Sequence, residues 1–170
     1  MKLLIIISAF VFTTCFAYQP VNKNYLQNKI NLNVMYNNYP ELREANIKLV
    51  PKFAKILQLN GWLYPAVYLA RTDTIYINKE VSPLIFSQAI LHEWGHKIYD
   101  TKLSNFRRKQ WVKMFEENPV YVSDCSKLNA EENWAEWVSI YYYKMEADGF
   151  KDVEELKRIK QALFINYILQ

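Results

Sequence analysis

Two histidines four residues apart constrain this chain more than any other feature. Residues 91–96 read Leu-His-Glu-Trp-Gly-His and contain both of the histidines in the 170-residue sequence. On an α-helix this spacing puts both imidazole rings on one face, a turn apart, so both can reach one metal ion. Glu93 follows the first histidine, where a carboxylate can hold a zinc-bound water and accept its proton. The motif therefore predicts a zinc site with His92 and His96 as ligands and Glu93 as general base.

A zinc site of this kind needs the motif to lie on a helix. The residues around the motif predict a helix from about Ser82 to Asp100. Ser82 and Pro83 suit the N-cap and the first helical position. The spacing of the apolar residues predicts a buried side made of Phe86, Ala89, Ile90, Trp94 and Ile98. The alternative is an ordinary amphipathic helix whose two histidines are packed or solvated.

A third ligand is expected from a second predicted helix, which runs from Asn129 to about Ala147. Glu132 and Glu136 lie on one face of it, and two histidines with one glutamate are a standard ligand set for catalytic zinc. We expect Glu132 to be the ligand and Glu136 to orient a ligand histidine through its free ring nitrogen. Glu131 competes for the ligand position, and a solvated acidic face near a helix N-terminus is the alternative for the pair.

Two further positions test other zinc patterns. A histidine six residues beyond His96 is typical of a metzincin, but that position is Lys102. Asp100 continues the same helix past the metal and can ligate zinc only with distortion. We interpret Asp100 as a residue that supports a metal ligand from behind or ends the helix.

The order of these motifs resembles the catalytic domain of the anthrax lethal factor family, which includes small secreted Pro-Pro endopeptidases. The resemblance covers residues 62–168 and is carried by the interval from His96 to Glu132 and by a pattern around it, formed by Asn129, Glu132, Trp134, Ala135 and Glu136. It implies a zinc endopeptidase with His92, His96 and Glu132 as ligands and Glu93 as general base, and a preference for proline near the cut.

The chain departs from this family at one position. Family members carry a tyrosine seven residues before the ligand glutamate, thought to stabilise the oxyanion, and that residue is Cys125 here. Tyr121 is the nearest tyrosine that offers an alternative donor. The departure keeps a second function open, a catalytically weak or inactive zinc-containing binding or toxin-like module. A third alternative, a compact zinc peptidase that cuts repressor-like proteins, fits poorly with the predicted export.

Export is predicted from the N-terminus. Residues 1–17 combine a positive start at Lys2, an apolar run from Leu3 to Phe12 and small residues at Cys15 and Ala17, as in a signal peptide. The run is shorter than the ~20 residues that span a membrane. We predict cleavage after Ala17, a secreted chain and no stable membrane anchor; an uncleaved anchor is the alternative.

Composition limits the remaining classes. Removal of residues 1–17 leaves 20 basic and 17 acidic side chains, a mild net charge of +3 that gives nucleic-acid binding little support. A single cysteine, Cys125, then remains, so no intrachain disulfide can form. Residues 18–170 are long enough for one domain with its own core. We expect a monomer that binds a peptide or protein substrate in extended form.

The rest of the chain predicts a mostly helical α+β domain with a small sheet, a compact zincin-like arrangement. We expect an N-terminal arm or short helix in 18–39, helical structure in 41–60 stopped by Gly61, a short helix over 106–115 and a final helix over 153–169. Alternating apolar residues predict a β-hairpin over 64–78, in which the strand Thr74–Asn78 or its partner pairs with substrate or simply belongs to the core. Residues 120–128 should form a loop that overhangs the cleft.

Overall fold

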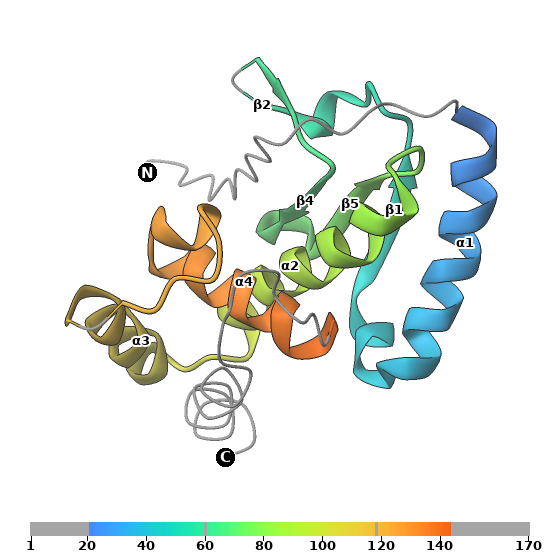
Figure 1. The fold of residues 1–170 in the computed structure, drawn as a ribbon. Coiled ribbons are helices and arrows are strands. Elements are labelled where there is room, and N and C mark those ends of the chain that lie inside the picture. Colours follow the sequence, from blue (N-terminus) through green and yellow to red (C-terminus); the bar gives the residue numbers. More distant parts are fainter. Residues whose placement is uncertain (1–20, 60, 118, 144–170) are drawn as a thin grey trace.

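The computed structural model describes residues 21–59, 61–117 and 119–143, and their fold is α+β, as predicted (Figure 1). The predicted signal peptide and the predicted helix at 153–169 lie outside the described residues. The α-helices are α1 (Val21–Asn38), α2 (Pro83–Thr101), α3 (Asn105–Glu117) and α4 (Ala130–Tyr143). The strands are β1 (Asn46–Val50), β2 (Gln58–Leu59), β3 (Trp62–Leu63), β4 (Ala66–Leu69) and β5 (Thr74–Asn78).

A three-stranded sheet forms the β part of the body, in the order β1-β5-β4. The predicted hairpin is present, because β4 and β5 pair in antiparallel fashion with Ala66 opposite Ile77 and Leu69 opposite Thr74. Strand β1 adds to the other side of β5 in parallel, with Asn46 opposite Thr74. The central strand is therefore β5, and β4 and β1 form the two edges.

The prediction of helical structure in 41–60 is wrong. The segment contains short 3-10 turns, strand β1 and strand β2. Ile47 and Leu49 alternate with polar residues over only five positions, and the strand obtains its hydrogen bonds from β5, almost thirty residues further along the chain. Pro51 follows as a residue without an N–H to donate. A partner so distant in sequence leaves no local signal beyond this short alternation.

Gly61 does not stop a helix either. It lies between β2 and β3, which pair as a two-stranded ribbon with Leu59 opposite Trp62. Its φ of 82° is in the left-handed region that glycine adopts without a steric penalty. Asn-Gly between two strands is a strong hairpin signal, and the dipeptide 60–61 carried it in the sequence.

The helices surround α2, which lies at the centre of the molecule (Figure 1). One face of the sheet packs on α2 through Ala66, Tyr68, Ile75 and Ile77, and α4 packs along its other side. Helix α1 takes up most of the segment 18–39, for which an arm or a short helix was predicted. It is joined to the β5–α2 connection, where buried Asn28 donates hydrogen bonds to the carbonyls of residues 79 and 81. Among the described residues, no helix is long and apolar enough to cross a membrane.

Candidate metal centre

Helix α2 carries the motif into the core. It begins at Pro83 after the N-cap Ser82 and ends at Thr101, close to the predicted limits. All five predicted apolar residues are buried, but residues 91–97 are buried as well. A helix covered almost all round is expected for one that packs against the sheet, α1 and α4 together. The two histidines and Glu93 therefore lie in the interior, each at most 2% exposed.

Asn129 begins the helix that brings the carboxylates. Its side-chain oxygen accepts hydrogen bonds from the backbone N–H groups of Glu131 and Glu132, at 3.0 and 2.9 Å. These are two of the N–H groups that a helix N-terminus leaves without an intrahelical partner. The cap fixes the first turn of α4, and that turn is where Glu131 and Glu132 stand.

Gly95 allows α2 and α4 to approach closely. A Cβ atom at this position would lie 2.7 Å from the Cα of Ala135 and 3.1 Å from the Cβ of Val138. The indole of Trp134 donates a hydrogen bond to the carbonyl of Gly95 at 3.1 Å, across the same contact. Close backbone approach at this point brings the side chains of α4 to the histidines of α2.

Three side-chain atoms converge where these helices meet. His92 Nε2 lies 3.1 Å from His96 Nε2 and 3.2 Å from Glu132 Oε2, and His96 Nε2 lies 3.6 Å from Glu132 Oε2. Bonds of about 2.0–2.1 Å in a tetrahedral arrangement place ligand atoms about 3.3 Å apart. The triangle has that size. His92, His96 and Glu132 therefore lie close enough to hold a metal ion.

The carboxylate oxygen in this triangle is suited to a metal. Glu132 Oε2 is buried and meets no hydrogen-bond donor in good geometry among the described residues. A buried carboxylate oxygen without a donor costs free energy. A cation at the centre of the triangle would remove this cost.

Both histidines are oriented by a second carboxylate. His92 Nδ1 lies 2.9 Å from Glu136 Oε1, which is the contact expected from the sequence. His96 Nδ1 lies 3.1 Å from Glu131 Oε1. Glu131, considered above as a competing ligand, is thus placed behind His96, while Glu132 faces both Nε2 atoms. A carboxylate on Nδ1 directs Nε2 toward a metal and raises its basicity.

The electrostatics of the cluster also favour a cation. Burial lowers the pKa of His96, but the neighbouring carboxylates of Glu131 and Glu132 outweigh burial and raise it to about 10. Burial raises the pKa of Glu132, and the two neighbouring histidine rings outweigh it and lower the pKa to about 2. Without a metal, protons on the imidazoles offset the negative charge of the carboxylates. A divalent cation offsets the same charge in their place.

Glu93 is held from the sheet. Its Oε2 accepts a hydrogen bond of 2.6 Å from the backbone N–H of Tyr68 on β4. Burial raises the pKa of Glu93, and the nearby histidines and this hydrogen bond oppose the shift. Among the described residues, β4 pairs on one side only, with β5. The N–H of Tyr68 points away from β5, so it can reach the helix.

A second connection between β4 and α2 was not expected from the sequence. Lys97, buried beside His96, forms an ion pair with Asp73 in the β4–β5 turn. The hydroxyl of Tyr68 donates a hydrogen bond to the same carboxylate at 3.1 Å. Asp73 has a φ of 47°, a left-handed conformation that aspartate tolerates better than most residues. The turn is thus tied to the helix that carries the motif.

The other predicted site residues lie as follows. Asp100, one turn after His96 and near the end of α2, lies 3.9 Å from a guanidinium nitrogen of Arg108. Tyr121 is exposed and packs edge-on against Phe115 of α3. Cys125 is buried in a small cluster with Leu57, Tyr64 and Val67. The structure does not bring Tyr121 or Asp100 into the triangle of donor atoms.

The loop over 120–128 is fixed by its own hydrogen bonds. The hydroxyl of Ser126 accepts from the N–H groups of residues 122 and 123 and donates to the carbonyl of residue 123. The side-chain amide of Asn133 on α4 donates to the carbonyls of Val120 and Ser126. These hydrogen bonds hold the loop in one conformation and attach it to α4.

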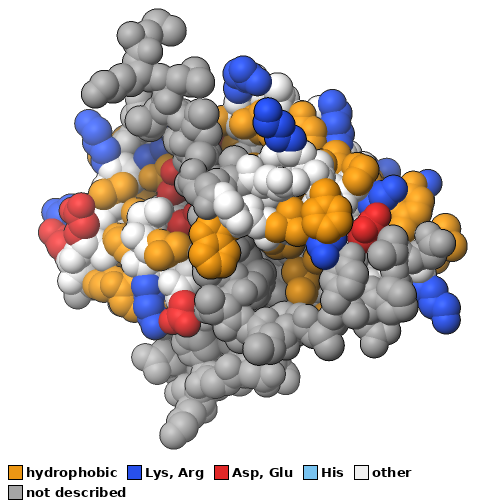
Figure 2. Space-filling view, turned by 90° about the horizontal axis from the view of Figure 1, so that it is seen from above, with side chains coloured by type: hydrophobic (Ala, Val, Ile, Leu, Met, Phe, Trp, Pro, Cys, Tyr) orange, Lys and Arg blue, Asp and Glu red, His pale blue; other side chains and the backbone are white. Residues whose placement is uncertain are grey.

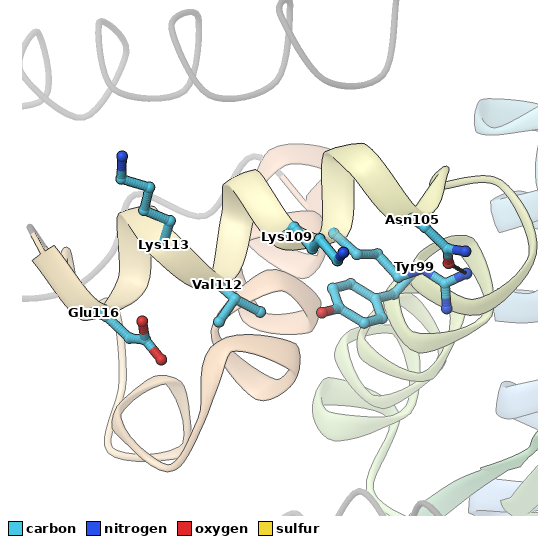
Figure 3. A pocket seen from close by; sticks show the side chains of 7 residues that line it. Tyr99, Asn105, Lys109, Val112, Lys113 and Glu116 are labelled. Carbon is cyan, nitrogen blue, oxygen red and sulfur yellow. Dashed lines mark hydrogen bonds between the residues drawn. The ribbon is translucent and has the colours of Figure 1, made fainter.

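A groove of about 480 Å³ lies elsewhere, on α3 and the end of α2 (Figure 3). Tyr99 and Val112 are among its lining side chains, with Lys109, Lys113 and Glu116 along one face of α3. None of its lining residues belongs to the metal centre.

Comparison of the chain with protein-family models, with curated proteins and with solved structures gave no match.

Proposed function

We propose that this chain is a secreted zinc-dependent endopeptidase. The observation that carries the proposal is the buried triangle of His92, His96 and Glu132, with Glu93 next to it on the same helix. Two imidazoles and one carboxylate leave a fourth position for water, as catalytic zinc sites do. The resemblance of the motif order to the anthrax lethal factor family supports the same assignment.

The three donor side chains favour zinc, but iron(II) is a competing metal. Two histidines and one carboxylate also bind iron(II) in oxygenases. A glutamate directly after the first histidine on the helix is the feature that peptide hydrolysis uses and that iron chemistry does not need. Glu93 occupies that position, so we assign zinc, and metal analysis of the purified protein tests the assignment.

The residues of the chain divide the proposed reaction between them. Zinc held by the triangle would supply the Lewis acidity that makes a water molecule nucleophilic near neutral pH. Glu93 accepts a proton from that water while the oxygen of the water bonds to the peptide carbonyl carbon. Glu93 then gives the proton to the leaving nitrogen as the C–N bond breaks. The Tyr68 N–H holds the Glu93 carboxylate in place.

The sheet topology selects the strand that would bind substrate. Strand β5 pairs with β1 and β4 on its two sides, so it has no edge to offer, and this half of the sequence prediction is excluded. Its partner β4 remains. The outward carbonyls of Ala66 and Tyr68 lie along its edge and can accept hydrogen bonds from an extended peptide.

The test uses the chain from Tyr18, a diverse peptide library and mass spectrometry, with the metal content measured in parallel. We expect about one zinc per chain and discrete cuts. The Glu93→Gln variant should keep its zinc and lose about 100- to 10,000-fold in kcat/KM, the usual contribution of a general base. Glu116→Gln, an exposed carboxylate on α3, is the matched control and should cut normally.

Two outcomes would change the assignment. Zinc-loaded protein that cuts no peptide would support the zinc-containing binding module, with Cys125→Tyr as the first variant to examine. Iron in place of zinc, together with no peptide hydrolysis, would contradict the assignment as a peptidase. Residues flanking the cuts would show whether proline is preferred.

A further inference from the structure

The ribbon of β2 and β3 stands out from the body (Figure 1). It also carries exposed apolar side chains. Trp62 is 63% exposed, and its neighbour Leu63 is exposed as well. Consecutive residues of a strand point to opposite faces, so these two side chains lie on the two sides of the ribbon. Helix α1 also exposes apolar side chains, Leu26, Ile30 and Val34, which lie along one face of that helix. The ribbon differs because its exposed apolar side chains lie on both of its faces.

Phe53 belongs to the same surface. Its side chain is 72% exposed, and its carbonyl accepts a hydrogen bond of 2.7 Å from the side chain of Gln58. Gln58 pairs with Leu63 across the ribbon. Phe53 is thus linked to the ribbon through Gln58, and we call the exposed side chains of Phe53, Trp62 and Leu63 the ribbon surface.

The segment that leads into the ribbon is basic. Residues 45–59 contain Lys48, Lys52 and Lys55 and no aspartate or glutamate. Lys55 is exposed, and the ammonium of Lys52 lies 5.1 Å above the ring of Phe53. Figure 2, a view from the side on which the ribbon stands, shows Lys and Arg side chains, and also Asp and Glu side chains, beside hydrophobic ones on this face.

We propose that the ribbon surface docks reversibly on an anionic lipid membrane. Trp favours the boundary between headgroups and acyl chains, where its ring is apolar and its N–H is hydrated. Lysines around it are attracted to anionic headgroups. Lipid can also surround a ribbon that is apolar on both faces, whereas a protein partner would have to enclose it. Only a few apolar side chains would enter the lipid, and only a few lysines would meet its headgroups. Membrane binding should therefore be weak and should need both apolar insertion and electrostatic attraction.

Trp62 reports its own docking. The other four tryptophans, at positions 94, 111, 134 and 137, are each at most 5% exposed. Acrylamide in solution therefore quenches Trp62 selectively. With the chain from Tyr18 and vesicles of phosphatidylglycerol and phosphatidylcholine, we expect a blue shift of the emission and protection from acrylamide. Phosphatidylcholine alone, or 0.5 M salt, should give neither change.

Substitutions separate the two contributions. Trp62→Ser should lower vesicle partitioning about ten-fold or more, since a large apolar side chain no longer enters the lipid. Lys55→Gln should lower partitioning to anionic vesicles about five-fold. Leu84→Ser, at an equally exposed position on α2, and Lys109→Gln on α3 are the matched controls and should leave it unchanged.

The proposal does not depend on the metal centre, so peptidase activity and membrane docking can fail separately. Unchanged Trp62 emission with anionic vesicles, in a chain that keeps its metal and its circular dichroism, would overturn it. So would an equal loss of partitioning in Leu84→Ser. Protection of Trp62 by an acidic protein or peptide but not by vesicles would assign the ribbon surface to a protein partner instead.

Discussion

Gly95 is the residue on which the geometry of the metal centre depends most directly. Ala is the better helix former by about 1 kcal/mol, so propensity alone predicts that Gly95→Ala stabilises α2. The added Cβ would lie 2.7 Å from the backbone of Ala135, which cannot move without α4. Overpacking of this kind costs about 1–3 kcal/mol. We expect a net loss of up to about 2 kcal/mol in the free energy of unfolding and at least about ten-fold weaker metal binding.

Gly61 supplies the control for this prediction. A Cβ there meets nothing within 4 Å, but the φ of 82° strains any other residue. Gly61→Ala should therefore lower stability by a similar amount while metal affinity stays the same. Denaturant unfolding and metal titration of both variants distinguish the two cases. Equal metal affinity in Gly95→Ala and the parent would show that the approach of α2 to α4 does not set the triangle.

The protonation of the histidines predicts a pH dependence. The pKa of His96 is raised to about 10 without a metal, so His96 is protonated near pH 7.5 and must lose its proton to bind a cation. Glu132, with a pKa of about 2, is already ionised. We expect metal binding at pH 7.5 to release at least about one proton. Calorimetric titrations in buffers of different ionisation enthalpy measure this number, and a heat that is independent of the buffer would contradict the shift.

The same shift acts on the stability of the metal-free chain. Its folded-state pKa lies above the usual 6.5 of histidine, so the contribution of His96 is complete below about pH 6.5. The contribution is then lost as the pH rises through about 10. Glu132 acts in the opposite sense, because its stabilisation is lost as the pH falls from about 4.5 through about 2. The metal-free protein should thus melt at a lower temperature at pH 9.5 than at pH 6.

At the scale of elements, the β4–β5 turn and α2 are joined by the Asp73–Lys97 pair. Asp73→Asn keeps a residue that tolerates a left-handed φ and removes only the charge. The buried ammonium of Lys97 then loses its partner, at a cost of about 1–2 kcal/mol, less than for a fully buried pair because Asp73 is half exposed. The Tyr68 hydroxyl then donates to a neutral amide oxygen, which accepts a weaker hydrogen bond than a carboxylate. Tyr68 should therefore hold Glu93 less firmly, and we expect kcat to fall while KM changes little.

Lys102 and Glu44 provide the comparison. They form an ion pair of 3.0 Å between two exposed side chains. Pairs of this kind contribute about 0–1 kcal/mol, so Lys102→Gln should change neither stability nor kcat measurably. Chemical unfolding and peptide kinetics of both variants give the answer. If Asp73→Asn behaved like Lys102→Gln, the turn would have no part in positioning Glu93.

At the scale of the whole molecule, a bound metal would cross-link two helices that lie more than thirty residues apart in the chain. The unfolded chain cannot present the same triangle, so binding adds to the stability of the folded state. At a free metal concentration about 100 times Kd the gain is about 2.7 kcal/mol, or about 5–10 °C in Tm for a chain of this length. Calorimetry with zinc and with a chelator should show this difference. A His96→Ala variant should melt at the same temperature in both, and a parent chain that did so too would show that the metal is not held by both helices.

Local patterns in the sequence determined the elements whose signals are local. The helix over 82–100 is set by its proline and its apolar spacing, while Ser82 at the N-cap position forms no side-chain capping hydrogen bond. The helix that begins after Asn129 is set by a side chain that caps it. The hairpin over 64–78 follows from alternation within a few residues. The histidine motif and the glutamates four residues apart fixed which residues could bind a metal, because helical periodicity alone puts them on one face.

Only the tertiary structure decided which of these residues meet. Strand β1 is defined by a parallel partner far along the chain, so its own five residues resembled part of a helix. Glu131 and Glu132 are adjacent in sequence, and the rotation of α4 against α2 at Gly95 puts one behind His96 and the other beside both Nε2 atoms. The Tyr68 N–H reaches Glu93 because β4 is an edge strand beside α2. Contacts of this kind depend on distances between elements, which a one-dimensional pattern does not contain.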